Sequence, residues 1–161
     1  MEQPYKGGYR MEGKMKVMIM EDIGKVAIRK MDIPKPGPGQ VLVRIHQCNI
    51  CTVDWQTWKG FRKSMGRKFP WAPGHEMAGE IVELGEGVTN PALKIGTHVV
   101  FGGQSSRGCG ECHFCRLGHP DRCTNKPKEV EFGGIVGSFG FSQYAAYESS
   151  RLYPISDNLP Y

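Results

Sequence analysis

Four cysteines carry the most specific chemical signal in the sequence. They follow the spacing Cys109-x2-Cys112-x2-Cys115-x7-Cys123. Four thiolates can surround a zinc ion on a tetrahedron, with zinc–sulfur distances of about 2.3 Å. Two disulfides are the alternative, but three cysteines so closely and evenly spaced favour a metal. We therefore predict a structural zinc site formed by Cys109, Cys112, Cys115 and Cys123.

The lobe that carries these cysteines, residues 103–128, has almost nothing else to order it. Its only large apolar residues apart from cysteine are Phe114 and Leu117, too few to offset the conformational entropy of the segment. Zinc binding at comparable sites contributes about 10–16 kcal/mol in model peptides. We expect this lobe to be ordered only with metal bound.

A second group of residues offers the ligand types of a catalytic zinc. Cys51 follows a predicted strand, and His75 and Glu76 come later in the chain. Thiolate, imidazole and carboxylate can bind zinc while one position stays open for water or substrate. Asp54 is suited to accept a hydrogen bond from the ring nitrogen of His75 that faces away from the metal. Residues of these types are usually structural when they occur singly, so the case depends on their pairing with the four-cysteine motif.

Together these motifs resemble the zinc-containing medium-chain dehydrogenases, the family of alcohol, sorbitol and threonine dehydrogenases. The segment Gly74-His75-Glu76-x2-Gly79-x5-Gly85-x2-Val88 is similar to the zinc signature of that family, and the cysteine spacing is similar too. The resemblance implies a mainly β, GroES-like, partly open barrel with short helices and the structural zinc lobe. It also implies that Cys51 and His75 bind catalytic zinc, with Glu76 beside the metal.

The resemblance further implies a function for a larger protein. This chain would be the catalytic portion of a dehydrogenase in which zinc polarises a secondary alcohol or polyol for hydride transfer to NAD or NADP. In the family, one more zinc ligand and the Rossmann cofactor domain lie beyond the equivalent of Tyr161, and no G-x-G-x-x-G follows a strand here. We expect the chain to be inactive alone, with a possible role in a homo-oligomer. The alternatives are a stand-alone zinc-binding or interaction domain, or one half of a split dehydrogenase.

One position departs from the family pattern. Two residues after the first zinc cysteine the family usually has Thr or Ser, whose hydroxyl relays the substrate proton, whereas this sequence has Val53. Thr52 is one place early, and a helix turns by about 100° per residue, so its side chain points elsewhere. This departure argues against the proton route that is usual in the family, and with it against a simple alcohol as substrate.

Several other residues have both a functional and a structural interpretation. Cys48 could join a metal site, but a small apolar role in a strand is more common. An aromatic group could line a substrate cleft or belong to the core: Trp55, Trp58 and Phe61. A basic run could hold an anionic substrate group or form a solvated loop, which is the commoner case: Lys59, Arg62, Lys63, Arg67 and Lys68.

The elements that position these residues are mostly short strands. Apolar and alternating runs predict strands at residues 15–20, 25–33, 41–45, 77–84, 97–101, 143–147 and 151–155. Residues 52–58 contain no helix breaker and predict a short helix, while the Pro- and Gly-rich residues 34–39 break regular structure. We expect a disordered lead-in at 1–14 and one domain at 15–161.

Composition agrees with this reading and excludes other classes. A chain of 161 residues with 22 glycines and 11 prolines suits short strands and tight turns. The net charge of +5 is weak evidence for a nucleic-acid partner. The chain has no run of about 18 apolar residues and begins without the apolar stretch of a signal peptide. We expect a cytoplasmic protein with a small-molecule partner and no membrane or nucleic-acid partner.

Overall fold

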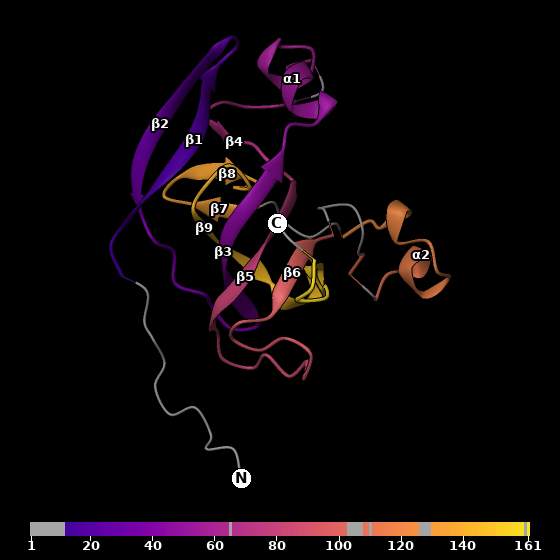
Figure 1. The fold of residues 1–161 in the computed structure, drawn as a ribbon. Coiled ribbons are helices and arrows are strands. Elements are labelled where there is room, and N and C mark those ends of the chain that lie inside the picture. The colour runs from indigo at the N-terminus through magenta and orange to yellow at the C-terminus, as the bar shows by residue number, and fades with distance from the viewer. Residues whose placement is uncertain (1–11, 65, 103–107, 110, 126–129, 160) are drawn as a thin grey trace.

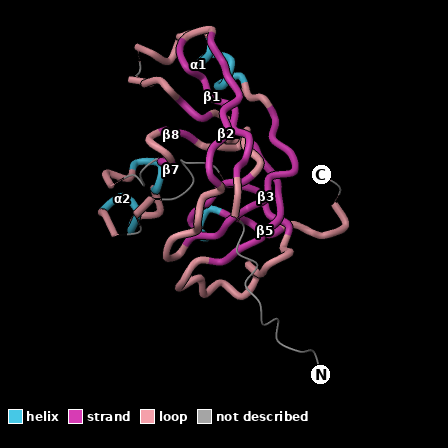
Figure 2. Tube along the Cα trace, turned by 90° about the vertical axis from the view of Figure 1, so that its left-hand side faces the viewer, coloured by secondary structure: helices cyan, strands magenta, loops and turns pink. Residues whose placement is uncertain are grey.

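The computed structural model describes residues 12–64, 66–102, 108–109, 111–125, 130–159 and 161. Most of the expected lead-in and parts of the 103–128 lobe therefore lie outside the described residues. Two five-stranded sheets form a partly open barrel, which confirms the predicted fold class (Figures 1 and 2). Among the described residues, no helix has the length and apolar character needed to cross a membrane.

The first sheet has the strand order β2-β1-β4-β8-β7. The long hairpin of β1 and β2 forms one edge, and β4 pairs in parallel with β8, while the remaining pairs are antiparallel. The strands are β1 (Lys14–Asp22), β2 (Lys25–Asp32), β4 (Trp71–Ala72), β7 (Val130–Phe132) and β8 (Ile135–Gly137).

The second sheet has the order β10-β6-β5-β3-β9 and is antiparallel throughout. Its strands are β3 (Gln40–Asn49), β5 (Glu76–Leu84), β6 (His98–Phe101), β9 (Tyr144–Glu148) and β10 (Leu152–Pro154). An isolated bridge between Val17 and Ser142 connects the two sheets, because Ser142 leads directly into β9.

The core lies between the inner faces of the two sheets. Alternate residues of β1 (Met15, Val17 and Ile19) are buried, as a strand with one face on the core requires. Three consecutive residues of β3, at 41–43, are buried, so both faces of this strand are covered there. At the centre Phe101 and Tyr147 stack with ring centroids 4.6 Å apart. The core therefore rests on the β-strands and needs no helix.

The helices lie at the periphery. α1 (Thr52–Trp58) has the predicted bounds and lies at one end of the barrel, after β3. α2 (His113–Arg116) belongs to the cysteine lobe, which projects sideways from the barrel in Figure 1. Two 3-10 turns complete the elements, η1 (Pro120–Arg122) and η2 (Ser149–Arg151).

Candidate metal centres and the adjoining cavity

The four cysteines of the lobe converge on one point. Their sulfur atoms all lie within 4.8 Å of one another, and Cys112 Sγ is 3.9 Å from Cys123 Sγ. A tetrahedron with zinc–sulfur distances of about 2.3 Å has sulfur–sulfur edges of about 3.8 Å. All six cysteines of the chain are unbridged, so the disulfide alternative is not adopted. The arrangement fits a zinc ion.

The backbone of the lobe favours thiolates at this point. The N–H of Cys112 donates to Cys109 Sγ at 3.3 Å, and the N–H of Cys109 donates to Cys123 Sγ at 3.2 Å. A hydrogen bond from the backbone N–H of Cys115 is the main cause that lowers the pKa of Cys112 to about 5. The pKa of Cys109 is lowered mainly by the N–H of Cys112. Thiolates are the form in which cysteine binds metal.

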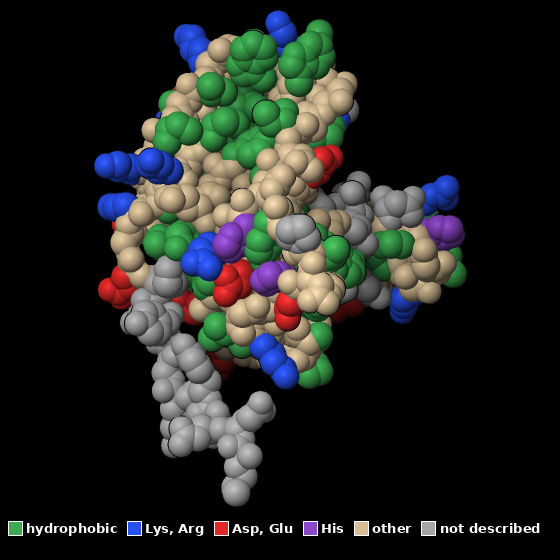
Figure 3. Space-filling model, in the orientation of Figure 1, with side chains coloured by type: hydrophobic (Ala, Val, Ile, Leu, Met, Phe, Trp, Pro, Cys, Tyr) green, Lys and Arg blue, Asp and Glu red, His purple; other side chains and the backbone are tan. Residues whose placement is uncertain are grey.

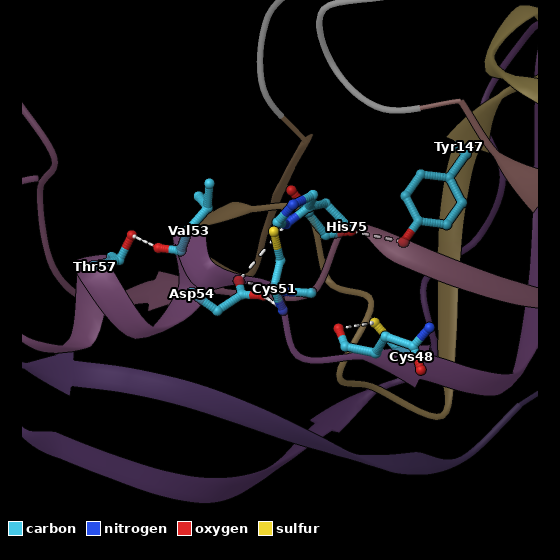
Figure 4. A network of polar contacts seen from close by, with 10 residues as sticks. Cys48, Cys51, Val53, Asp54, Thr57, His75 and Tyr147 are labelled. Carbon is cyan, nitrogen blue, oxygen red and sulfur yellow. Dashed lines mark hydrogen bonds and ion pairs between the residues drawn. The ribbon is translucent and has the colours of Figure 1, made fainter.

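The second candidate centre gathers Cys51, His75 and Glu76. One ligand atom from each lies within 4.8 Å of the others. Cys51 is the N-cap residue of α1, where the chain leaves β3, and His75 directly precedes Glu76, the first residue of β5. Because β3 and β5 are paired, with Asn49 opposite Glu76, both segments emerge at the same end of the sheet. Figure 4 shows Cys51 and His75 facing each other.

Asp54 connects the two segments that carry these ligands. Its side chain is buried, and its oxygens accept the backbone N–H groups of Cys51 at 3.0 Å and Gly74 at 3.3 Å. His75 Nδ1 lies 3.6 Å from Asp54 Oδ1, longer than a hydrogen bond (Figure 4). The expected direct bond to the ring is therefore not formed in this structure. The carboxylate instead holds the backbones on either side.

Two glycines of the zinc signature stand where the backbone leaves no room for a side chain. Gly74 has a φ of +90°, and a Cβ there would lie 2.6 Å from the backbone nitrogen of Phe141. A Cβ at Gly79 would meet the carbonyl oxygen of Arg44 at 2.3 Å, because β5 packs closely on β3. The motif therefore specifies the backbone path as well as the ligands.

A cavity of about 260 Å³ adjoins the second centre. His75 forms part of its wall, together with residues from α1, the turn after α1 and β4. The lining residues are Val53, Asp54, Thr57, Arg62, Arg67, Trp71, Pro73, Gly74, His75 and Ser138. Arg62, Arg67 and Trp71 thus share a cavity wall with the candidate ligand His75, an arrangement that the sequence did not indicate for Trp71.

The position that departs from the family pattern lies in this wall. Val53 presents an alkyl side chain to the cavity, and the hydroxyl of Thr57 donates to the Val53 carbonyl oxygen at 2.8 Å (Figure 4). Thr57 is buried, and its hydroxyl satisfies a helix carbonyl. Thr52 is exposed and does not line the cavity.

The structure distinguishes between the two interpretations offered for Cys48 and for the aromatic residues. Cys48 packs against the core and is not among the ligands of the second centre, and burial raises its pKa to about 12. Trp55 and Phe61 are 48% and 62% exposed, so they do not belong to the core, and neither lines the cavity beside His75. Hydrophobic side chains gather on the surface at the end of the molecule that carries α1 and the β1–β2 hairpin (Figure 3).

Comparison with known proteins defines the class. The family model described as the alcohol dehydrogenase GroES-like domain matches residues 37–157. The chain belongs to this family, as the resemblance of the zinc signature implied.

Particular relatives are dehydrogenases. The chain is 33% identical over 140 residues to L-threonine 3-dehydrogenase of Pyrococcus horikoshii, an alignment covering 81% of this chain and 36% of the relative. It is 31% identical over 144 residues to D-arabinitol dehydrogenase 1 of Uromyces fabae, covering 89% and 38%. A proposed zinc-binding dehydrogenase from Sinorhizobium meliloti 1021, solved with NADP, superposes with a TM-score of 0.72 at 28% identity, covering 92% and 40%. The chain thus spans little more than a third of the length of these curated relatives.

Proposed function

We propose that this chain supplies the catalytic domain of a zinc-dependent, NAD(P)-linked dehydrogenase acting on an alcohol or polyol. The family supports the class, and the names of the relatives support the chemistry. The observation that carries the proposal is the gathering of three ligand atoms, from Cys51, His75 and Glu76, beside a cavity that His75 lines. A catalytic zinc site needs both ligands and an adjoining space for substrate.

In this proposal the two centres have different roles. Cys109, Cys112, Cys115 and Cys123 hold a structural zinc with a closed set of four ligands. Cys51, His75 and Glu76 hold a second zinc beside the cavity. When bound there, zinc supplies Lewis acidity to the hydroxyl oxygen of the substrate.

The surrounding residues of the chain position and enclose the reacting group. Asp54 fixes the backbones of Cys51 and Gly74, so that the ligands are held before substrate binds. Val53 offers no group that can accept a proton. The substrate proton therefore leaves by a route that does not use this position.

The cofactor and the domain organisation follow from the same proposal. Residues 15–161 form one domain, and NAD or NADP binds to a different domain of the enzyme. The structural relative solved with NADP supports a nicotinamide cofactor. We expect no NAD(P)-linked turnover from the 161 residues alone, because hydride transfer needs the cofactor held against the substrate. A reducing, cytoplasmic location and a possible homo-oligomer belong to this proposal, and the six unbridged cysteines support the location.

Metal analysis of the chain tests the two centres separately. We expect about one tightly held zinc per chain, lost in Cys112→Ser. Added Co²⁺ should occupy a second, weaker site with a thiolate-to-cobalt absorption band that Cys51→Ser removes. Cys48→Ser is the matched control, because Cys48 lies three residues earlier and outside the ligand group.

Two results would count against the assignment. Equal cobalt spectra for Cys51→Ser and Cys48→Ser would show that Cys51 is not a ligand. Two zinc ions held with equal tightness would contradict the expected difference between the lobe and the second centre.

A further inference from the structure

The cavity beside the second centre has an unusual wall for a neutral alcohol. Two guanidinium groups, Arg62 and Arg67, and one carboxylate, Asp54, are among the described residues that line it. Both Asp54 oxygens accept backbone N–H groups. The carboxylate is therefore already occupied by hydrogen bonds from the protein.

The environment of Arg62 favours a bound hydrogen-bond acceptor. Its Nε is buried and has no hydrogen-bond partner among the described residues. A buried donor without a partner costs free energy that a bound acceptor would recover. The side chain is half-buried and lines the cavity, so a ligand there can reach it.

Arg67 is held beside it by the local backbone and by an aromatic ring. The N–H of Arg67 donates to the carbonyl of Arg62 at 3.1 Å, which closes the turn between them. The guanidinium carbon of Arg67 lies 3.5 Å from the centroid of the buried Trp71 ring. A contact of this kind between a guanidinium and an aromatic face is favourable and holds the positive charge of Arg67 at the cavity wall.

The basic run divides by residue type. Arg62 and Arg67 are half-buried and line the cavity, whereas Lys59, Lys63 and Lys68 are exposed. In a loop that contributed only to solubility, we would expect the arginines to be as exposed as the lysines. The lysines match the solvated interpretation, and the arginines match the anion-binding one.

We propose that this cavity binds the anionic group of the substrate, so that the enzyme acts on a small alcohol that also carries a carboxylate or phosphate. Arg62, with Arg67 beside it, binds the oxyanion, and the hydroxyl lies toward His75. The inference rests on the proposed function for the identity of the ligand as a substrate. The volume of about 260 Å³ suits a compact molecule of a few carbons.

Three molecules with one carbon skeleton provide the test: glycerate, glycerol 3-phosphate and glycerol. Binding to the chain is measured by isothermal titration calorimetry, after chelator treatment and again with zinc restored. We expect at least one of the anions to bind about tenfold or more tightly than glycerol in both states, since charged hydrogen bonds are lost with the neutral ligand. Preference for one anion over the other identifies the group as carboxylate or phosphate.

Variants assign the effect to the cavity. Arg62→Met should reduce the affinity of the preferred anion to that of glycerol. Lys63→Met removes the same charge from the exposed neighbour and should leave the affinity within about twofold. Arg62→Lys should recover part of the affinity, which covers the case in which Arg62→Met fails to fold, as circular dichroism would show.

Equal binding of the three ligands, or equal losses in Arg62→Met and Lys63→Met, would overturn the inference. Anion binding that appears only with zinc restored would also overturn it, because the metal and not the arginines would then hold the anion. The two proposals can fail separately. Arg62-dependent anion binding together with a cobalt spectrum that does not respond to Cys51→Ser would support the anion site and reject the zinc assignment.

Discussion

Asp54→Asn should destabilise the domain at the point where its two ligand-bearing segments meet. The carboxylate is 5% exposed and accepts the N–H groups of Cys51 and Gly74 at 3.0 and 3.3 Å. The amide replaces one acceptor oxygen with a donor, so one of the two N–H groups, partly buried at Cys51 and buried at Gly74, loses its partner. From the strength of charged hydrogen bonds and the cost of an unsatisfied donor, we expect a loss of about 2–4 kcal/mol. For a domain of this size, that corresponds to a fall in Tm of about 4–16 °C.

Thermal denaturation followed by circular dichroism measures this effect against a matched control. Asp32→Asn makes the same chemical change at a side chain that is 73% exposed and paired with the exposed Lys14. Exposed pairs contribute about 0–1 kcal/mol, so this variant should melt close to the parent. Asp54→Asn should also weaken Co²⁺ binding at the second centre by about 10–100-fold and leave the lobe zinc in place. Equal melting temperatures for the two variants would refute the role of Asp54 as the connector of the two segments.

Three further outcomes follow from particular contacts. Gly74→Ala should lower the free energy of unfolding by about 2 kcal/mol or more in urea denaturation, because the new Cβ would meet the Phe141 backbone and the alanine would have a positive φ. Gly87→Ala is the control, because this position has a φ of +75° but open space around it, and the loss should be about 1–2 kcal/mol. Tyr147→Phe should cost about 1–3 kcal/mol in the same assay, because the buried carbonyl of Ser138 loses a 2.6 Å hydrogen bond, and an unchanged midpoint would contradict this. Chelator treatment should open the four-cysteine lobe to limited proteolysis while the barrel resists, and equal cleavage with and without chelator would show that metal does not order the lobe.

Most of the barrel could be predicted from hydrophobic alternation. The long strands β1, β2, β3 and β5 lie where apolar runs indicated them, and the helix at Thr52–Trp58 has the predicted bounds. The sequence did not indicate β4, β7 or β8, which have two or three residues each. Strands this short contain no readable period and exist only because neighbouring strands supply their hydrogen bonds.

The candidate ligands were predictable because metal chemistry restricts residue type and spacing. The positions of the residues around these ligands were harder to predict. That Asp54 would accept backbone N–H groups rather than the His75 ring depends on a separation of a few tenths of an ångström. The inward position of Arg62 depends on a turn after α1, and residue type alone does not distinguish an arginine facing solvent from one facing a cavity.

The zinc signature specifies close backbone contacts as well as metal ligands. His75 and Glu76 stand between Gly74, which has no room for a side chain against the 140–141 backbone, and Gly79, which has none against Arg44 on β3. A larger residue at either glycine would push the His75 segment away from Cys51 without changing any ligand. Such a variant should therefore lose metal at the second centre through geometry alone. This is why a motif with only two potential ligands, His75 and Glu76, can be specific to one fold.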